Sequence, residues 1–297
     1  MIEVTIPLWV WITLGAAALQ NLRSLLQKRL TGRLSVGGAT FARFLFAAPI
    51  ALIYVLVLHK WGAPLPDIPG QFWPIIFIGA VAQIIGTFAL VALFQFRNFA
   101  VGNAFSKTET LQAAFFGLIL LGEGLSPLAL LAILIGFGGI TVLSVPRGAR
   151  FDTKAALIGI GSGAGFGIAA ICYRASALSL TDTDTSMQAA IALLAALSIQ
   201  TVTMGAWLAL KEKGQIAQVI RAVRITALVS FVGVLSSIGW FTAMAMENAA
   251  LVRAVGQVEL VLSILTAWLI FKERSTKREL AGVVLIALSV ILIVFSR

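Results

Sequence analysis

Charged residues are scarce in this sequence: Asp, Glu, Lys and Arg make up 11% of its 297 residues, whereas hydrophobic residues make up 60%. Ordinary soluble domains contain about 25% charged residues. A soluble fold of this length could not bury so much apolar surface, so most of it must face lipid or other helices. The composition therefore excludes an ordinary soluble protein and predicts one that lies in a lipid bilayer.

Acidic residues are the scarcer charged class, which leaves a formal net charge of +10. Such a charge could indicate a nucleic-acid partner, but Lys and Arg occur here in short clusters between apolar runs. That distribution is typical of the cytoplasmic loops of membrane proteins. We therefore expect no nucleic-acid partner.

Cysteine and histidine occur once each, as Cys172 and His59. One cysteine excludes a disulfide within the chain, and these two residues cannot build a Cys/His zinc site. The motifs HExxH and GxSxG, which mark zinc proteases and serine hydrolases, are also absent from the sequence. The sequence therefore predicts a protein that is not an enzyme and that needs no metal or cofactor.

Long apolar runs dominate what is present. Spanning the hydrocarbon core takes about 20 apolar residues in a helix, and runs of this kind select helices rather than a barrel. The sequence predicts an all-α integral membrane protein with ten transmembrane helices. We place them at 8–28, 36–58, 72–94, 99–121, 127–145, 155–177, 186–210, 225–246, 249–271 and 280–295.

The basic residues between these runs predict the orientation. One set of loops holds most of them, in clusters such as Lys28–Arg33, Arg147–Lys154 and Lys272–Arg278, whereas the other side has Lys60, Arg174 and Arg297. Because positive loops stay in the cytoplasm, both termini are predicted to lie outside it. The expected location is a bacterial inner membrane.

The second half of the sequence repeats the first. At an offset of 150 residues, five positions of the fourth and ninth predicted helices and their ends are identical: Asn98 and Asn248, Ala100 and Ala250, Ala104 and Ala254, Glu109 and Glu259, and Glu123 and Glu273. Five helices per unit is an odd number, so two copies, 1–147 and 148–297, must have opposite orientations in the membrane. Inverted repeats are the architecture of alternating-access transporters, whose site lies near mid-bilayer between the repeats.

These features resemble the drug/metabolite transporter superfamily, specifically its EamA-type members. The resemblance rests on the five-plus-five pattern, on FARFLFAAPIAL in the second helix, and on the paired segments TETLQAAFFGLILLGE and VELVLSILTAWLIFKE. Many members have Glu-Pro in these segments; here the glutamates match Glu109 and Glu259, and Thr110 and Leu260 replace the proline. The resemblance implies a carrier of amino acids, other metabolites or drugs, often an exporter.

Ionisable residues inside a membrane helix are costly unless they are paired or face water. Glu109 and Glu259 are each predicted to lie about 15 Å into their helices, near the bilayer centre. One interpretation is a solute-binding or proton-linked pair. The other is a structural carboxylate held by a neighbouring helix, for which Arg43 is a candidate partner.

Two polar faces compete for the site on the fourth and ninth helices. Asn103 and Lys107 share one face, as do Arg253 and Gln257, because each pair is separated by four residues. The glutamates point about 200° away from positions 107 and 257 on a regular helix. Either face could line the site.

The sequence thus favours a secondary transporter of a small anionic or zwitterionic metabolite, with protons as a candidate coupling ion. A Lys or Arg in the site would bind a carboxylate or phosphate, and a carboxyl in the membrane could carry a proton. Trp240 is a candidate apolar wall of the site, although an aromatic residue in a membrane helix also serves for packing. The alternative function is a channel or a membrane scaffold that transports nothing.

Overall fold

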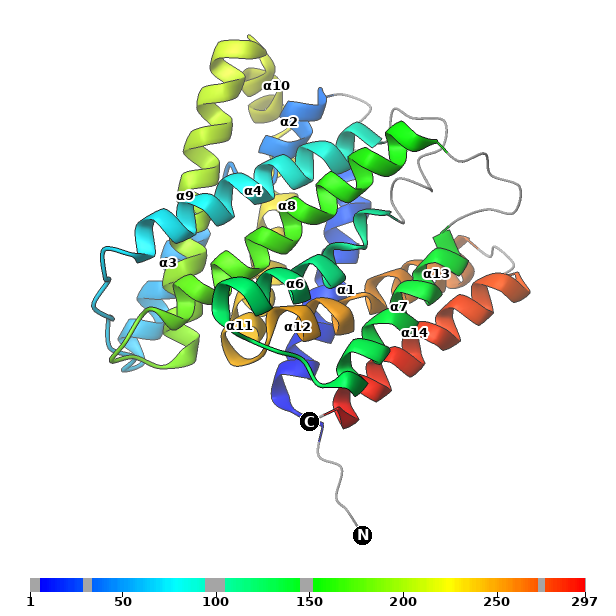
Figure 1. Ribbon diagram of the computed structural model, residues 1–297. Coiled ribbons are helices and arrows are strands. Elements are labelled where there is room, and N and C mark those ends of the chain that lie inside the picture. Colours follow the sequence, from blue (N-terminus) through cyan, green and yellow to red (C-terminus); the bar gives the residue numbers. More distant parts are fainter. Residues whose placement is uncertain (1–5, 29–33, 94–104, 145–151, 272–275, 297) are drawn as a thin grey trace.

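The computed structural model describes residues 6–28, 34–93, 105–144, 152–271 and 276–296. These residues form a bundle of helices, and this part of the chain contains one isolated β-bridge, between Asp67 and Thr181 (Figure 1). The all-α prediction is therefore confirmed. The helices are α1 (Leu8–Lys28), α2 (Val36–Phe41), α3 (Ala47–Lys60), α4 (Phe72–Leu93), α6 (Glu109–Leu121), α7 (Pro127–Ser144), α8 (Thr153–Leu178), α9 (Thr185–Lys211), α10 (Gln215–Arg221), α11 (Val223–Met246), α12 (Ala249–Gly256), α13 (Val258–Phe271) and α14 (Lys277–Phe295).

Helix length and composition fit a membrane. Within the described residues, α4, α8, α9, α11 and α14 are each long and apolar enough to cross a bilayer. α3, α6 and most of α7 are shorter apolar helices. The predicted ranges for seven helices agree with the structure to within three residues at each end, whereas the other three predicted helices are interrupted or incompletely described.

The predicted helix at 36–58 is wrong as a single helix, because it breaks between α2 and α3. Residues 42–46 form a turn in which several N–H groups bond three residues back, such as Phe44 N–H to Phe41 O and Ala47 N–H to Phe44 O. Pro49 then lies in the first turn of α3, where its missing N–H needs no helical partner. Arg43 lies within this break.

The predicted helices at 99–121 and 249–271 are also wrong as continuous helices. Lys107 and Thr108 form a turn before α6, and Gln257 forms a turn between α12 and α13. In both turns an N–H group bonds three residues back: Thr108 to Phe105 O, and Gln257 to Ala254 O. The bonds of a 3₁₀ turn replace those of the α-helix, so the regular α-helical bonding is interrupted at each turn. The two breaks are related by the repeat, because Lys107 and Gln257 differ by 150 residues.

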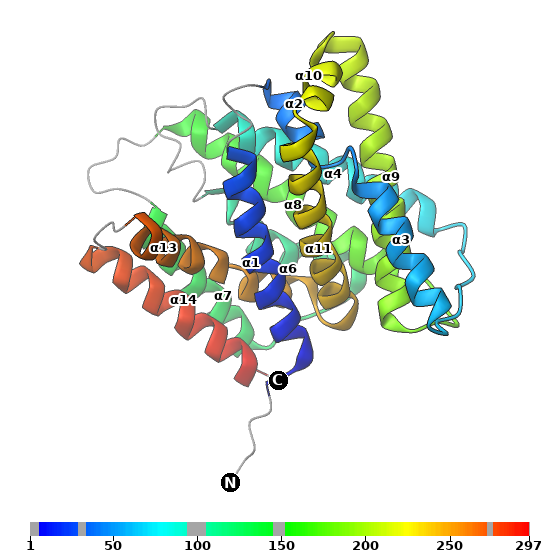
Figure 2. The ribbon, with the colours of Figure 1, turned by 180° about the vertical axis from the view of Figure 1, so that it is seen from behind.

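Packing between helices follows the repeat. α1 packs on α11 and α8 packs on α4, and exchanging the two halves of the chain converts the first contact into the second. In the same way, α6 on α8 corresponds to α12 and α13 on α1. α7 and α14 lie side by side and run in opposite directions, and α1 begins at the face where α14 ends (Figures 1 and 2).

Glycines allow the closest of these contacts. A Cβ atom on Gly165 of α8 would lie 2.7 Å from the Ala82 carbonyl oxygen and 2.9 Å from the Gly86 Cα of α4. The Ser162 hydroxyl donates a hydrogen bond of 2.8 Å to the Gly86 carbonyl in the same contact. Small residues of this kind let the backbones of membrane helices approach each other.

We expect Gly165→Ala to destabilise the protein by about 1–3 kcal/mol, because the added methyl group must push α8 away from backbone atoms of α4. Gly161→Ala is the matched control in the same helix, since a Cβ there meets nothing within 4 Å. Thermal unfolding in detergent measures both variants. Equal unfolding temperatures for the two would contradict the contact between α4 and α8.

Candidate functional site

The candidate site lies where the two broken helices meet. α6 contacts α12 in the middle of the molecule, so the breaks at Lys107–Thr108 and Gln257 come close together (Figure 1). Discontinuous helices are typical of transporter binding sites, because they bring polar groups to the membrane centre where irregular backbone is otherwise excluded. The break is thus the local structure that positions the site.

Two contacts between opposite charges cross from one half of the chain to the other. Lys107 Nζ lies 4.0 Å from Glu259 Oε2, and Arg253 Nη1 lies 4.0 Å from Glu109 Oε1. The four side chains retain 10–19% of their accessible surface. A separation of 4.0 Å exceeds hydrogen-bond length, so the attraction between the charges acts without a direct hydrogen bond.

A hydrogen-bond chain links Glu259 to Trp240 through a residue of α1. Gln20 Nε2 donates to Glu259 Oε2 at 2.6 Å, and Trp240 Nε1 donates to Gln20 Oε1 at 3.0 Å. The Arg253 guanidinium lies over the Trp240 ring, 5.0 Å from its centroid. Trp240 therefore fixes both a carboxylate and a cation of the site, in addition to forming an apolar surface.

The contact between Trp240 and α12 requires a glycine. A Cβ on Gly256 would lie 2.1 Å from Trp240 Cη2, so the ring occupies the space that any other residue would need. Gly256 ends α12, and Gln257 follows in the break. The ring and the break are thus adjacent.

Gln257 anchors the second break to the first half of the chain. Its Nε2 donates to the Thr110 hydroxyl at 2.6 Å, and both side chains are buried. Its Oε1 is buried and has no hydrogen-bond partner in the described part of the chain. Lys107 and Gln257 hold equivalent positions, so one break carries a charge and the other a neutral amide.

Arg43 lies near the site, but in the described part of the chain it forms an ion contact with neither Glu109 nor Glu259, for which the sequence made it a candidate partner. In the described residues, the ion contacts of Glu109 and Glu259 are with Arg253 and Lys107 rather than with Arg43. The Arg43 guanidinium lies 5.4 Å from the centroid of the Phe44 ring. It also lies within electrostatic range of Arg23 and Arg253, which repel it.

Six of the predicted site residues are brought together: Lys107, Glu109, Trp240, Arg253, Gln257 and Glu259. Arg43 is close to them, and Asn103 lies outside the described residues. Members of both polar faces that the sequence offered lie at the site: Lys107 lies 4.0 Å from Glu259, and Arg253 lies 4.0 Å from Glu109. No cluster of described His, Cys, Asp or Glu residues could hold a metal ion.

Gln20 and Arg23 on α1 were not predicted as site residues. Arg23 lies within electrostatic range of Glu259, and Gln20 bonds to it directly. Their spacing of three residues, which puts both on one face of α1, is the signal that could have identified them. Arg23 lies so near the end of α1 that its charge resembles that of the following basic loop.

A second buried polar group was also missed. The Tyr173 hydroxyl donates to Gln83 Oε1 at 3.0 Å and accepts a hydrogen bond of 2.9 Å from Gln200 Nε2. The Tyr173 ring stacks on Phe241, with centroids 4.4 Å apart. Arg43 interacts electrostatically with Tyr173, so this group borders the cationic side of the site. Its members come from α4, α8 and α9, far apart in sequence.

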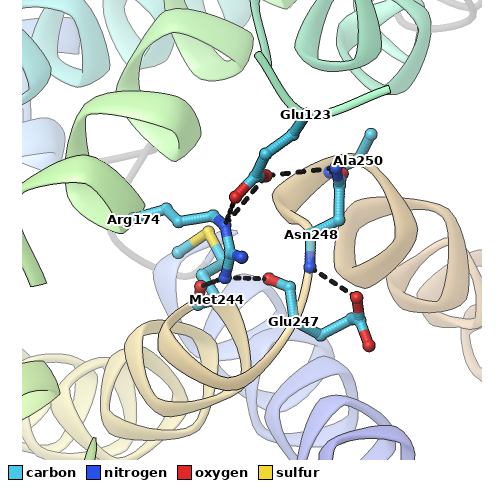
Figure 3. A network of polar contacts seen from close by, with 6 residues as sticks. All are labelled: Glu123, Arg174, Met244, Glu247, Asn248 and Ala250. Carbon is cyan, nitrogen blue, oxygen red and sulfur yellow. Dashed lines mark hydrogen bonds and ion pairs between the residues drawn. The ribbon is translucent and has the colours of Figure 1, made fainter. Parts of the chain in front are cut away.

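A third polar network joins the halves near the face where α14 ends. We call it the Arg174 network; it comprises Glu123, Arg174, Glu247, Asn248 and the Met244 carbonyl (Figure 3). Arg174 Nε lies 2.7 and 3.0 Å from the two carboxylate oxygens of Glu123, and its Nη1 donates to the Met244 and Glu247 carbonyls. Asn248 donates to Glu123 and accepts from the Ala250 N–H, capping α12. The network ties α8, the end of α6 and the start of α12 together.

Comparison with solved structures supports this fold. 28 chains match. One of them, described as "Crystal structure of protein", has a TM-score of 0.74 and 17% sequence identity, with 97% of this chain and 96% of that chain covered. At this identity the likeness shows the fold alone. No curated protein matches the chain.

The comparison with family models is decisive for identity. The model of the EamA-like transporter family matches residues 7–145 and again residues 153–295. The two matches cover nearly the whole chain, and they confirm both the sequence resemblance and the two-repeat architecture. The chain belongs to the EamA-like transporter family, whose members are integral membrane transporters of small molecules rather than enzymes.

Proposed function

We propose that this membrane transporter is a secondary carrier that moves a small anionic or zwitterionic metabolite by alternating access. The observation that carries the proposal is the pair of ion contacts at 4.0 Å, Lys107 with Glu259 and Arg253 with Glu109, each of which joins one half of the chain to the other. A solute that enters between these groups can exchange its own charges for theirs. The protein then binds the solute through groups on both halves, which must move relative to each other during transport.

The arrangement of helices supports two inverted repeats, 1–147 and 148–297, with ten spans. Joining α2 to α3 and α12 to α13, counting α6 as one span, and leaving out the seven-residue α10 gives this number. α1 and α8, which correspond in the repeat, run in opposite directions in both views (Figures 1 and 2). Carriers with such repeats alternate by moving one part against the other around a central site.

The Arg174 network supports a role in closing one face. Glu123 belongs to the first half, whereas Arg174 and Asn248 belong to the second. In alternating access, contacts of this kind form when a face closes and break when it opens. We assign this network to the closure of the face where α14 ends.

Export is the direction that the family resemblance implies. Protons remain our candidate coupling ion, because Glu109 and Glu259 are carboxyls within membrane helices. We place the protein in a bacterial inner membrane with both termini outside the cytoplasm.

We expect Lys107→Met and Glu259→Gln each to reduce transport at least about tenfold, because each change removes one charge of an ion contact that joins the two halves of the chain. Counterflow of labelled alanine, glutamate, malate and glycerol phosphate in proteoliposomes measures the effect. Lys60→Met, which removes an exposed lysine at the end of α3, is the control and should transport normally.

The result would count against the proposal if both variants transported at the wild-type rate, or if folded wild-type protein moved none of the four solutes. Conductance far above the turnover of a carrier would indicate the alternative function, a channel. Saturable flux that a solute on the opposite side accelerates would support the carrier.

We expect Arg174→Gln to open the face where α14 ends, because it removes charge-assisted hydrogen bonds worth about 1.5 kcal/mol, or roughly tenfold in the population of the open state. The measurement is the labelling rate of Met244→Cys in a Cys172→Ser background by an impermeant maleimide. Glu123→Gln should act in the same direction. If neither change accelerates labelling, the network does not close this face.

We expect a reporter fused after Arg297 to be active only if it functions outside the cytoplasm, because the basic loops lie on the opposite side of the proposed membrane. Fusions of alkaline phosphatase, active outside the cytoplasm, and of a fluorescent protein, active inside it, provide the two arms. If the fluorescent-protein fusion fluoresced and the alkaline phosphatase fusion were inactive, the C-terminus would lie in the cytoplasm and the predicted orientation would be wrong.

A further inference from the structure

Positive charge exceeds negative charge at the candidate site. Four cationic side chains lie within electrostatic range of one another or of the two carboxylates: Arg23, Arg43, Lys107 and Arg253. Lys107 and Arg253 face Glu259 and Glu109. Among the described residues, Arg23 and Arg43 therefore add two positive charges that the two carboxylates do not balance.

The side chains of these two arginines both pass over Gly233 of α11, which has no side chain of its own. A Cβ on Gly233 would lie 3.3 Å from Arg23 Cδ and 3.8 Å from Arg43 Cγ, so the glycine provides the surface on which both side chains rest. Arg43 is fixed by the break between α2 and α3, and Arg23 by α1. Two like charges held next to each other inside a membrane protein are unfavourable unless nearby negative charge compensates both of them, and a bound anion can supply that charge.

The hydrogen-bond donors of this region are also unused. Arg23 Nε and Nη1 and Arg253 Nε are buried and have no hydrogen-bond partner in the described part of the chain. Buried donors of a charged group are costly when they remain unpaired. Guanidinium groups bind carboxylate and phosphate oxygens through paired N–H donors, so these atoms match such a ligand in chemistry as well as in charge.

We propose that Arg23 and Arg43 form a subsite for a doubly charged anionic group, and that the transported solute is a dianion: a phosphate ester or a dicarboxylate. This inference rests on the proposed function and narrows its solute class. A zwitterion such as an amino acid brings no net charge and leaves both excess positive charges in the membrane. A monoanion balances one of them, and a dianion balances both.

Binding to purified protein in detergent tests this subsite without transport. Thermal unfolding is followed with succinate or glycerol phosphate at pH 8, and with butyrate or alanine at the same ionic strength. Succinate, glycerol phosphate or both should raise the unfolding temperature, since a ligand of the folded state stabilises it. Butyrate and alanine should have little effect. The two dianions also distinguish paired carboxylates from a phosphate.

Arg23→Gln and Arg43→Gln should each weaken dianion binding by about tenfold or more, because each removes a charged donor. Without ligand, these variants should be at least as stable as the wild type, because one of two repelling charges is gone. A merely structural arginine would give the opposite result, a loss of stability. Arg221→Gln, an exposed arginine at the end of α10, should change neither property.

Arg43→Lys is the second variant, since it keeps the charge and loses the paired donors. It should bind the dianion with intermediate affinity. Equal binding of succinate and butyrate, or wild-type binding by both glutamine variants, would overturn the proposed subsite. Transport of alanine without any binding of dianions would reject the subsite and leave the carrier function intact. Dianion binding without flux of any solute would instead reject the carrier function.

Discussion

A charge inside the hydrocarbon layer must be neutralised within the protein, and this constraint shapes the centre of the molecule. Arg253 partly neutralises Glu109, and Lys107 partly neutralises Glu259; in each contact the two residues belong to opposite halves of the chain. Separating the halves at these points would break both ion contacts. The halves are therefore coupled by electrostatics at the candidate site.

The breaks in the helices allow these partners to meet. On regular helices, Lys107 and Glu109 would point in different directions, as would Gln257 and Glu259. A turn at position 107–108 and another at 257 interrupt the α-helical bonding next to these residues. Both repeats have the same kind of backbone turn at this position, but the side chains in the two turns differ. Lys107 contacts a carboxylate, whereas Gln257 bonds to the Thr110 hydroxyl, so the two halves contribute unequally to the site.

Sequence alone predicted most of the helices because apolar runs mark them directly; α1 agrees at both ends, Leu8 and Lys28. It also identified the two glutamates, since carboxyls are rare inside such runs. The breaks at 107–108 and 257 escaped prediction because no proline marks them, although Pro49 could have indicated the break before α3. Partners across the halves depend on how distant helices pack, which no local pattern encodes. Arg23 was missed for the related reason that its charge lies near a basic loop.

The short helix α12 connects the site to the Arg174 network. Asn248 caps its N-terminus by accepting a hydrogen bond from the Ala250 N–H, and it also bonds to Glu123; Gly256 ends the helix against the Trp240 ring. All eight of its residues are buried, and Arg253 projects from it toward Glu109. A helix of this length spans about 12 Å. In the proposed mechanism, a solute that displaces α12 when it binds Arg253 also displaces Asn248, which bonds to Glu123 at the far end. That mechanism links binding at the centre to closure of the face through one element.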